Sequence, residues 1–73
     1  MVEQLIKDYK LEVEFMVTND TTMNNQVTIE EGNNEGYYIT IVNNGKEYTI
    51  RQHNYNEALK ILGVMLKVIN PNK

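Results

Sequence analysis

Residues 41–50 read IVNNGKEYTI, and this stretch decides the fold. Two runs of alternating apolar residues meet at Asn44-Gly45, a dipeptide that favours the two-residue type I′ turn of a β-hairpin. Such a turn sets the pairing of its two strands. The expected inward-facing pairs are Ile41–Tyr48 and Ile39–Ile50, and the expected outward-facing pairs are Thr40–Thr49 and Tyr38–Arg51. A slip of one residue would turn the whole apolar set to solvent, so the turn fixes the register.

The same alternation continues upstream of the hairpin. Residues 10–17 predict one strand with a period of two, and residues 26–30 predict a second, shorter one. In the first strand the residues expected to face the core are Leu11, Val13, Phe15 and Val17. The polar residues 18–25 and 31–36 are expected to form a loop and a turn. A short helix is predicted before the first strand from the helical spacing of Val2, Leu5, Ile6 and Tyr9.

A longer helix is predicted after the hairpin. Asn54, followed three residues later by Glu57, has the form of a helix cap with a reciprocal partner, and Pro71 is expected to end the helix. The apolar residues of this helix sweep about half of its circumference, which is wider than the stripe that one sheet face usually requires. The other half is expected to hold Asn56, Glu57, Lys60, Gly63 and Lys67, with Val64 among them. The apolar surplus is expected to contact either the first helix or another subunit.

Together these elements predict one small α+β domain over residues 1–73. It comprises a short N-terminal helix, an antiparallel meander of three to four strands, and a C-terminal helix packed on one sheet face. The other sheet face is expected to be wet and to carry Glu12, Glu14, Thr28, Tyr38, Thr40, Thr49 and Arg51. So short a chain has a small core, and because it has no Cys for disulfides, a second subunit is the stabilising device that its composition still permits.

The composition argues against catalysis. Cys and Ser are both absent, which excludes a cysteine or serine nucleophile and a thiolate metal site. His53 is the only histidine, and no obvious nucleophile lies beside it in the sequence. The glycines match no phosphate-loop spacing, and residues 30–35 lack the frame of a calcium loop. We therefore expect that the protein is not an enzyme and uses no cofactor or metal.

The chain shows no sign of export. Its first residues do not have the form of a secretory signal, and the longest apolar run, residues 61–66, is interrupted by Gly63 and is too short to span a bilayer. The sequence therefore predicts a cytosolic protein. Asparagine supplies eleven of the 73 residues, and together with Lys, Ile and Tyr it is typical of AT-rich coding sequence, which suggests a low-GC bacterium, a phage or a plasmid.

Charge is divided unevenly along the chain. Residues 1–35 carry eight acidic and two basic residues, a balance of −6, and residues 36–73 carry two acidic and five basic residues, a balance of +3, which gives the net charge of −3. The candidate partner-binding residues in the acidic half are Glu12, Glu14, Glu30, Glu31 and Glu35. Carboxylates on a rigid sheet can steer toward a basic surface and compete with phosphates there. The simpler interpretation is that they keep a small domain soluble.

The order of short helix, strand, polar loop, hairpin and helix, with the hairpin written YYITIVNNGKEYTI, resembles that of small phage-encoded anti-CRISPR proteins that inhibit type II-A Cas9. The resemblance is best over residues 37–50 and extends loosely over residues 1–55, where Asp8-Tyr9 leads into the first strand. It implies a protein whose acidic surface mimics DNA and blocks a basic pocket. The C-terminal helix is apolar and basic here, whereas the inhibitor that it resembles carries acidic residues in that half of the chain, so the five glutamates are assigned by charge and not by alignment.

The leading hypothesis is a non-enzymatic phage or mobile-element protein that inhibits a host defence protein by protein–protein interaction in the host cytosol. A homodimer is expected through apolar residues of the C-terminal helix, namely Leu59, Leu62, Leu66 and Ile69. One alternative is a structural or assembly module that acts through the same helix. A second is a nucleic-acid-binding accessory factor that uses Lys60, Lys67, Arg51 and Tyr38, although the single Arg and the negative net charge disfavour direct nucleic-acid binding.

Overall fold

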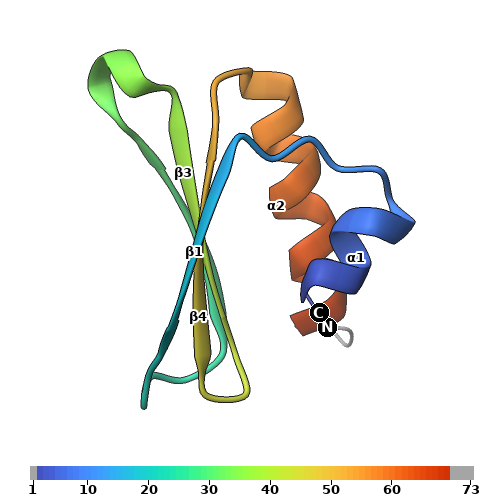
Figure 1. Cartoon of the computed structure of the whole chain (residues 1–73), viewed down its shortest axis with the longest axis vertical. Helices are drawn as coiled ribbons and strands as arrows, with labels where there is room; N and C mark the ends of the chain where they lie inside the picture. Colours follow the sequence, from blue (N-terminus) through green and yellow to red (C-terminus); the bar gives the residue numbers. More distant parts are fainter. Residues whose placement is uncertain (1, 70–73) are drawn as a thin grey trace.

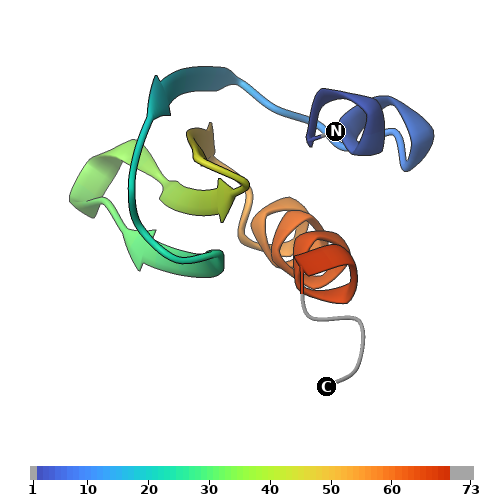
Figure 2. The same cartoon turned by 90° about the horizontal axis from the view of Figure 1, so that it is seen from below.

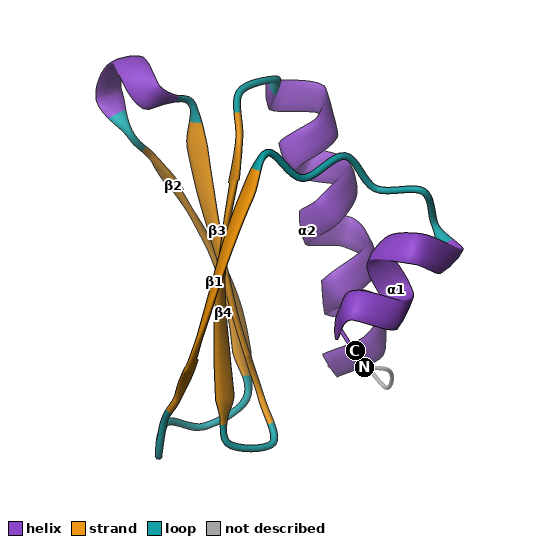
Figure 3. Cartoon of the chain, viewed as in Figure 1, coloured by secondary structure: helices purple, strands orange, loops and turns teal. Residues whose placement is uncertain are grey.

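A computed structural model describes residues 2–69. The elements in chain order are α1 (Val2–Asp8), β1 (Phe15–Asp20), β2 (Gln26–Glu31), the 3₁₀ turn η1 (Asn33–Glu35), β3 (Tyr37–Asn43), β4 (Lys46–Gln52) and α2 (Tyr55–Ile69). The four strands form one twisted antiparallel sheet, and both helices lie on the same side of it (Figures 1 and 3). The predicted α+β class, with its N-terminal helix, antiparallel strands and C-terminal helix on the sheet, is confirmed. Pro71, predicted to end the last helix, lies outside the described residues.

The strand order in the sheet is β1-β4-β3-β2. Strands β2, β3 and β4 form a meander, and β1 pairs with β4 instead of with β2. The segment between β1 and β2 therefore passes the tip of the β3–β4 hairpin (Figure 2). There the Thr21 N–H donates to the carbonyl of Gly45 (3.0 Å), and the Asn44 N–H donates to the side-chain oxygen of Asn25 (2.9 Å). As a result, β1 and β2 are the two edge strands.

The hairpin of β3 and β4 has the register predicted from its turn. Asn44 and Gly45 have φ angles of 52° and 83°, and positive values at both positions are what a type I′ turn requires. The confirmed pairs are Ile41–Tyr48, Ile39–Ile50, Thr40–Thr49 and Tyr38–Arg51. The inward-facing residues of these pairs are all buried, so the turn does place the apolar set against the helices.

The core lies between the sheet and the two helices. Its buried residues are Val2, Leu11, Ile39, Ile41, Tyr48, Ile50, Ala58, Ile61 and Met65. Val64, which the helical pattern placed in the polar half of α2, also packs against this core, so that part of the prediction is wrong. The physical reason is that α1 contacts α2, which widens the covered part of the helix. Tyr9, predicted on the apolar face of α1, follows the end of that helix and is 47% exposed.

The first strand begins later than predicted. The chain bends at Glu14, and β1 starts at Phe15. Before the bend the predicted inward residues do face the core, because Leu11 is buried and Val13 packs against it. After the bend the alternation is inverted, and Phe15 and Val17 are 49% and 38% exposed. The prediction that these two side chains face the core is therefore wrong.

Pairing with β4 explains the inversion. Met16 lies opposite Ile50 and packs against the core, so its neighbours in β1 must point to the outer face of the sheet. Phe15 lies opposite Arg51, whose guanidinium carbon is 5.6 Å from the centre of the Phe15 ring. Such a contact between a cation and an aromatic ring compensates in part for the exposure of the ring.

Candidate functional site

The five predicted glutamates lie at one end of the sheet. Glu12 and Glu14 come directly before β1, Glu30 and Glu31 end β2, and Glu35 lies in η1. All five are exposed. Because β1 begins where β4 ends, and β2 ends where β3 begins, antiparallel pairing brings these chain segments to the same end. We call the surface formed by these five residues the acidic end.

The acidic end consists of two separate groups. β1 and β2 are opposite edges of the sheet, so three strand spacings, about 14 Å, separate Glu14 from Glu30. Glu30 lies in the outer-face row with Tyr38 and Arg51, whereas Glu31 points to the helix side. The structure therefore brings the predicted residues to one end but does not gather them on one face.

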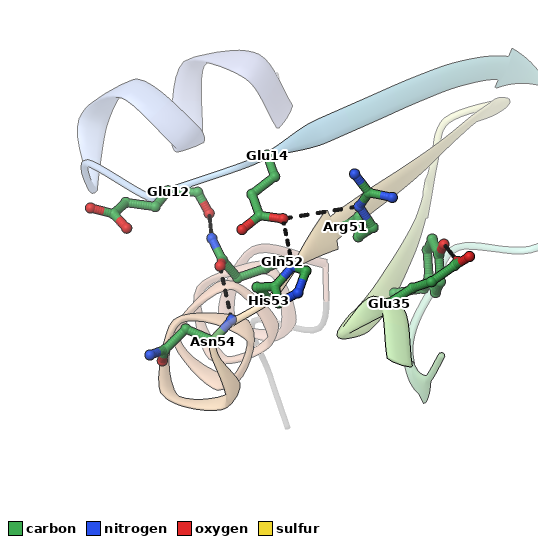
Figure 4. Close-up of polar contacts among 8 residues, drawn as sticks. Glu12, Glu14, Glu35, Arg51, Gln52, His53 and Asn54 are labelled. Atoms are coloured by element: carbon green, nitrogen blue, oxygen red, sulfur yellow. Dashed lines mark hydrogen bonds and ion pairs between the residues drawn. The ribbon is translucent and has the colours of Figure 1, made fainter. Parts of the chain in front are cut away.

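The group next to β1 contacts two neighbouring side chains, Arg51 and His53. Glu14 Oε1 lies 3.2 Å from His53 Nδ1 and 4.0 Å from Arg51 Nε (Figure 4). The Glu14 N–H also donates to the carbonyl of Arg51 (3.1 Å). Glu14 therefore joins the segment before β1 to the end of β4, and less of its charge is available to a partner than the sequence suggested.

A buried glutamine fixes the same segment. Gln52 is 4% exposed, and its Nε2 donates to the carbonyl of Glu12 (2.6 Å), while its Oε1 accepts from the N–H of Asn54 (3.0 Å; Figure 4). Asn54 in turn caps α2, because its Oδ1 accepts from the Glu57 N–H (3.0 Å). The cap is as predicted, but Gln52 takes the place of the predicted reciprocal partner, Glu57.

The structural role of Gln52 was not predicted from the sequence, although its position in the hairpin register indicated one. In the predicted register Gln52 lies opposite Tyr37, an inward-facing residue, and the structure has this pair. A polar residue at an inward position must find hydrogen-bond partners, so its position alone indicated a structural clamp.

The group next to β2 contains a hydrogen-bonded tyrosine. The Tyr38 hydroxyl donates to Glu35 Oε1. This bond favours the neutral hydroxyl and raises the pKa of Tyr38; burial adds to the effect, and Arg51 opposes it. Within the described part of the chain, the carboxylates of Glu12, Glu30 and Glu31 make no such contact, and the last two are adjacent in the sequence at the end of β2.

An ion pair lies at the other end of the sheet. Lys46 Nζ donates to Asp20 Oδ1 (2.7 Å), which joins the end of β1 to the start of β4. The hydrogen bond and the charge of Lys46 hold the pKa of Asp20 below its usual range, and the same hydrogen bond and charge from Asp20 raise the pKa of Lys46. Both side chains are largely exposed, so the stabilisation is small.

Replacing Asp20 with asparagine is expected to remove a stabilisation that depends on pH. The contribution of Asp20 is present above its unfolded pKa of about 3.9 and is lost as the pH falls through the lower folded value. The contribution of Lys46 is present below its unfolded pKa of about 10.4 and is lost as the pH rises through the higher folded value. Urea midpoints of the native chain and the D20N variant should differ at pH 7 and converge as the pH falls through the folded pKa of Asp20. An equal difference at pH 2 and pH 7 would contradict this assignment.

The residues predicted for nucleic-acid binding lie on opposite sides of the molecule. Arg51 and Tyr38 belong to the outer face of the sheet, whereas Lys60 and Lys67 belong to α2, which covers the inner face. No common basic surface forms from these four residues. The residues predicted for a dimer lie along α2: Leu59 and Leu66 are each 40% exposed, Leu62 is partly buried, and Ile69 packs against the core.

No family model, curated protein or solved structure matches this chain. Over residues 2–69, no helix is long and apolar enough to cross a membrane. The same residues contain no group of three or more His, Asp or Glu side chains placed to hold a metal ion. The fold and its surfaces define a small α+β protein with an acidic sheet end and an outer sheet face that neither helix covers.

Proposed function

We propose that this protein is a non-enzymatic inhibitor of phage or mobile-element origin, which binds a basic surface of a host defence protein in the host cytosol. The observation that carries the proposal is the placement of five exposed carboxylates at one end of a rigid sheet. The segments that carry them are fixed by Gln52 and by the strand pairing, so little ordering is required when a partner binds.

The binding residues are best assigned to the β2 side of the acidic end. Glu30 and Glu31 are exposed at adjacent positions, and they point to opposite faces of the sheet. A basic groove that receives the end of β2 would therefore contact one carboxylate on each wall. Glu14 and Glu35 instead hold neighbouring side chains in place, which makes them positioning residues.

Charge reversal tests this assignment with a type II-A Cas9–guide complex as the probe, the target that the resemblance of the hairpin implies. The native chain should block binding of a target DNA duplex, and the variant E30K/E31K should weaken that block at least tenfold. The reason is that reversed charges repel a basic surface instead of attracting it, and the effect should shrink as salt is raised.

A matched control distinguishes the effect of where the carboxylates lie from the effect of the net charge of the protein. The variant D8K/E47K makes the same change in net charge away from the acidic end, and it should inhibit like the native chain. Equal inhibition by the native chain and E30K/E31K would show that the acidic end is not the binding surface. No inhibition by the native chain would exclude this effector as the target.

A second candidate function is an assembly module that acts through α2. The observation in its favour is the exposure of three large apolar side chains of α2, those of Tyr55, Leu59 and Leu66. Under this alternative, the acidic end tolerates charge reversal, and lysines at Leu62 and Leu66 abolish function.

A further inference from the structure

One flank of α2 carries an apolar ridge at the spacing of a helix–helix seam. Its residues are Tyr55, Leu59, Leu62 and Leu66. The intervals of four, three and four residues match the apolar positions of a heptad repeat. Tyr55 is 53% exposed, and Leu59 and Leu66 are each 40% exposed. We call these four residues the α2 ridge; the exposed Lys60 and Lys67 lie on the solvent side of the helix, roughly 110–130° round from the centre of the ridge.

The α2 ridge lies on the side of β2. α2 contacts β2 and β3 to the same extent and β4 less, and within residues 2–69 it makes no contact with β1. The Tyr55 ring packs on Tyr37 of β3, with the ring centres 5.2 Å apart. Val64 lies on the other flank of α2 and packs against the core, and α1 lies on the β1 side of α2 (Figure 2). The ridge and the open edge of β2 therefore form one continuous surface.

We propose that a second copy of this chain binds this surface about a twofold axis, with β2 antiparallel to β2 and α2 antiparallel to α2. The two sheets then become one sheet of eight strands, and the two ridges cover each other. This inference gives a geometry to the homodimer predicted from the sequence, and it does not depend on the acidic end being a binding surface.

Strand spacing supports this arrangement. Neighbouring strands lie about 4.8 Å apart, so the twofold axis would lie about 2.4 Å outside β2. α2 contacts β2 as well as β3 and β4, and the ridge lies on its β2 flank, so strand pairing at the β2 edge turns the two ridges toward each other. Packed helices have axes about 8–10 Å apart, which is about two strand spacings. The strand pairing and the helix pairing are therefore compatible in scale.

The strand pairing and the helix pairing also require a twofold axis at the same position along the strand direction. Tyr55 contacts Tyr37, which pairs with Glu31, so Tyr55 and Glu31 lie at about the same level of the sheet. Leu62 lies about 10.5 Å further along α2, and Thr28 lies about 10 Å back along β2. One twofold axis near Thr28 and Leu62 therefore satisfies both the strand pairing and the helix pairing.

The charges of β2 select the antiparallel direction. With Thr28 opposite its own counterpart, Val27 faces Ile29 of the second copy on the helix side. Glu30 then faces Gln26 of the second copy, so the acidic residues lie at opposite ends of the joined strands. A parallel arrangement would place each Glu30 beside its counterpart, and like charges directly opposite are unfavourable. Extension at the β1 edge instead would leave the α2 ridge uncovered.

Cysteine cross-linking tests the strand pairing, since the chain has no cysteine of its own. Residues directly opposite in an antiparallel pair have Cα atoms about 4.5–5.5 Å apart, which a disulfide can bridge. The variant T28C should form a disulfide-linked dimer under mild oxidation. The matched control T49C places the cysteine on the same outer face but in β4, an internal strand, and it should form the dimer at least tenfold more slowly.

Mass in solution tests the ridge. Light scattering should give twice the 8.5 kDa of one chain for the native protein and close to 8.5 kDa for L59K/L66K. The variant L59E/L66K should regain the dimer, because antiparallel ridges bring the introduced carboxylate of one copy to the introduced ammonium group of the other. The control K60E/K67E changes two charges on the solvent side of the same helix, away from the ridge, and it should stay dimeric.

Three outcomes would overturn the proposal. They are a native mass of 8.5 kDa at the highest soluble concentration, a dimeric L59K/L66K variant, and cross-linking of T49C as fast as that of T28C. Circular dichroism of each variant would show that a change of mass is not a loss of fold. L59K/L66K retains the acidic end, so these results are independent of the inhibition assay.

Discussion

Replacing Gly36 with alanine is expected to lower the free energy of unfolding by about 3 kcal/mol. Gly36 has φ 92° and ψ −135°, a conformation that is essentially restricted to glycine. A Cβ there would lie 2.8 Å from the Cα of His53 and 2.9 Å from the carbonyl oxygen of Gln52. Both are backbone atoms, so no side-chain rotation can relieve the contact. The loss is large for a domain whose total stability is about 4–11 kcal/mol at the usual value per residue.

Urea unfolding followed by circular dichroism measures this effect, and Gly63 supplies the control. A Cβ at Gly63 meets no atom within 4 Å, and the residue lies inside α2. Alanine there should raise the free energy of unfolding by about 0.5–1 kcal/mol, because glycine is a poor helix former. A shift of the urea midpoint in the same direction for G36A and G63A would contradict the close contact of Gly36 with the backbone of Gln52 and His53.

The second large effect is expected for Gln52. Methionine has a similar volume but cannot replace either hydrogen bond, so Q52M leaves the Glu12 carbonyl and the Asn54 N–H without partners in a partly buried position. A buried group without its partner costs about 1–3 kcal/mol, and because these two bonds are only partly buried, we expect the lower part of the summed range, a loss of about 2–4 kcal/mol.

Hydrogen exchange distinguishes the loss of the Gln52 hydrogen bonds from a general loss of packing. In Q52M the amide of Asn54 should exchange much faster than the amides at the centre of β3, because its acceptor is removed. The control Q4M removes an exposed hydrogen bond to Asp8 within α1 and should change stability by less than about 0.5 kcal/mol. Unchanged protection of Asn54 in Q52M would contradict the clamp.

The sequence predicted the hairpin well because its information is local. The dihedral angles of Asn44 and Gly45 fix the turn, and the turn fixes every pair of β3 and β4. The cap of α2 by Asn54 was predictable for the same reason, since its hydrogen bond spans three residues. The spacing of apolar residues also predicted the α+β class. A period of two indicates a strand, helical spacing indicates a helix, and both show which face is buried.

The position of β1 could not be read from the same pattern. Alternation continues without a break from Leu11 to Val17, and no residue type marks the bend at Glu14. What inverts Phe15 and Val17 is pairing with β4, a contact between segments distant in sequence. The division of the acidic end has the same origin, because strand order places Glu14 and Glu30 at opposite edges.

The arrangement of the sheet has a consequence for biosynthesis. The hairpin of β3 and β4 can form as soon as both strands have left the ribosome, but β1, made much earlier, has no place to dock until β4 is complete. Loop-closure entropy makes such a distant pairing slow compared with a hairpin. The β1 segment of a nascent chain must therefore wait in an extended and accessible form, with Phe15 and Val17 unshielded, until β4 has been made.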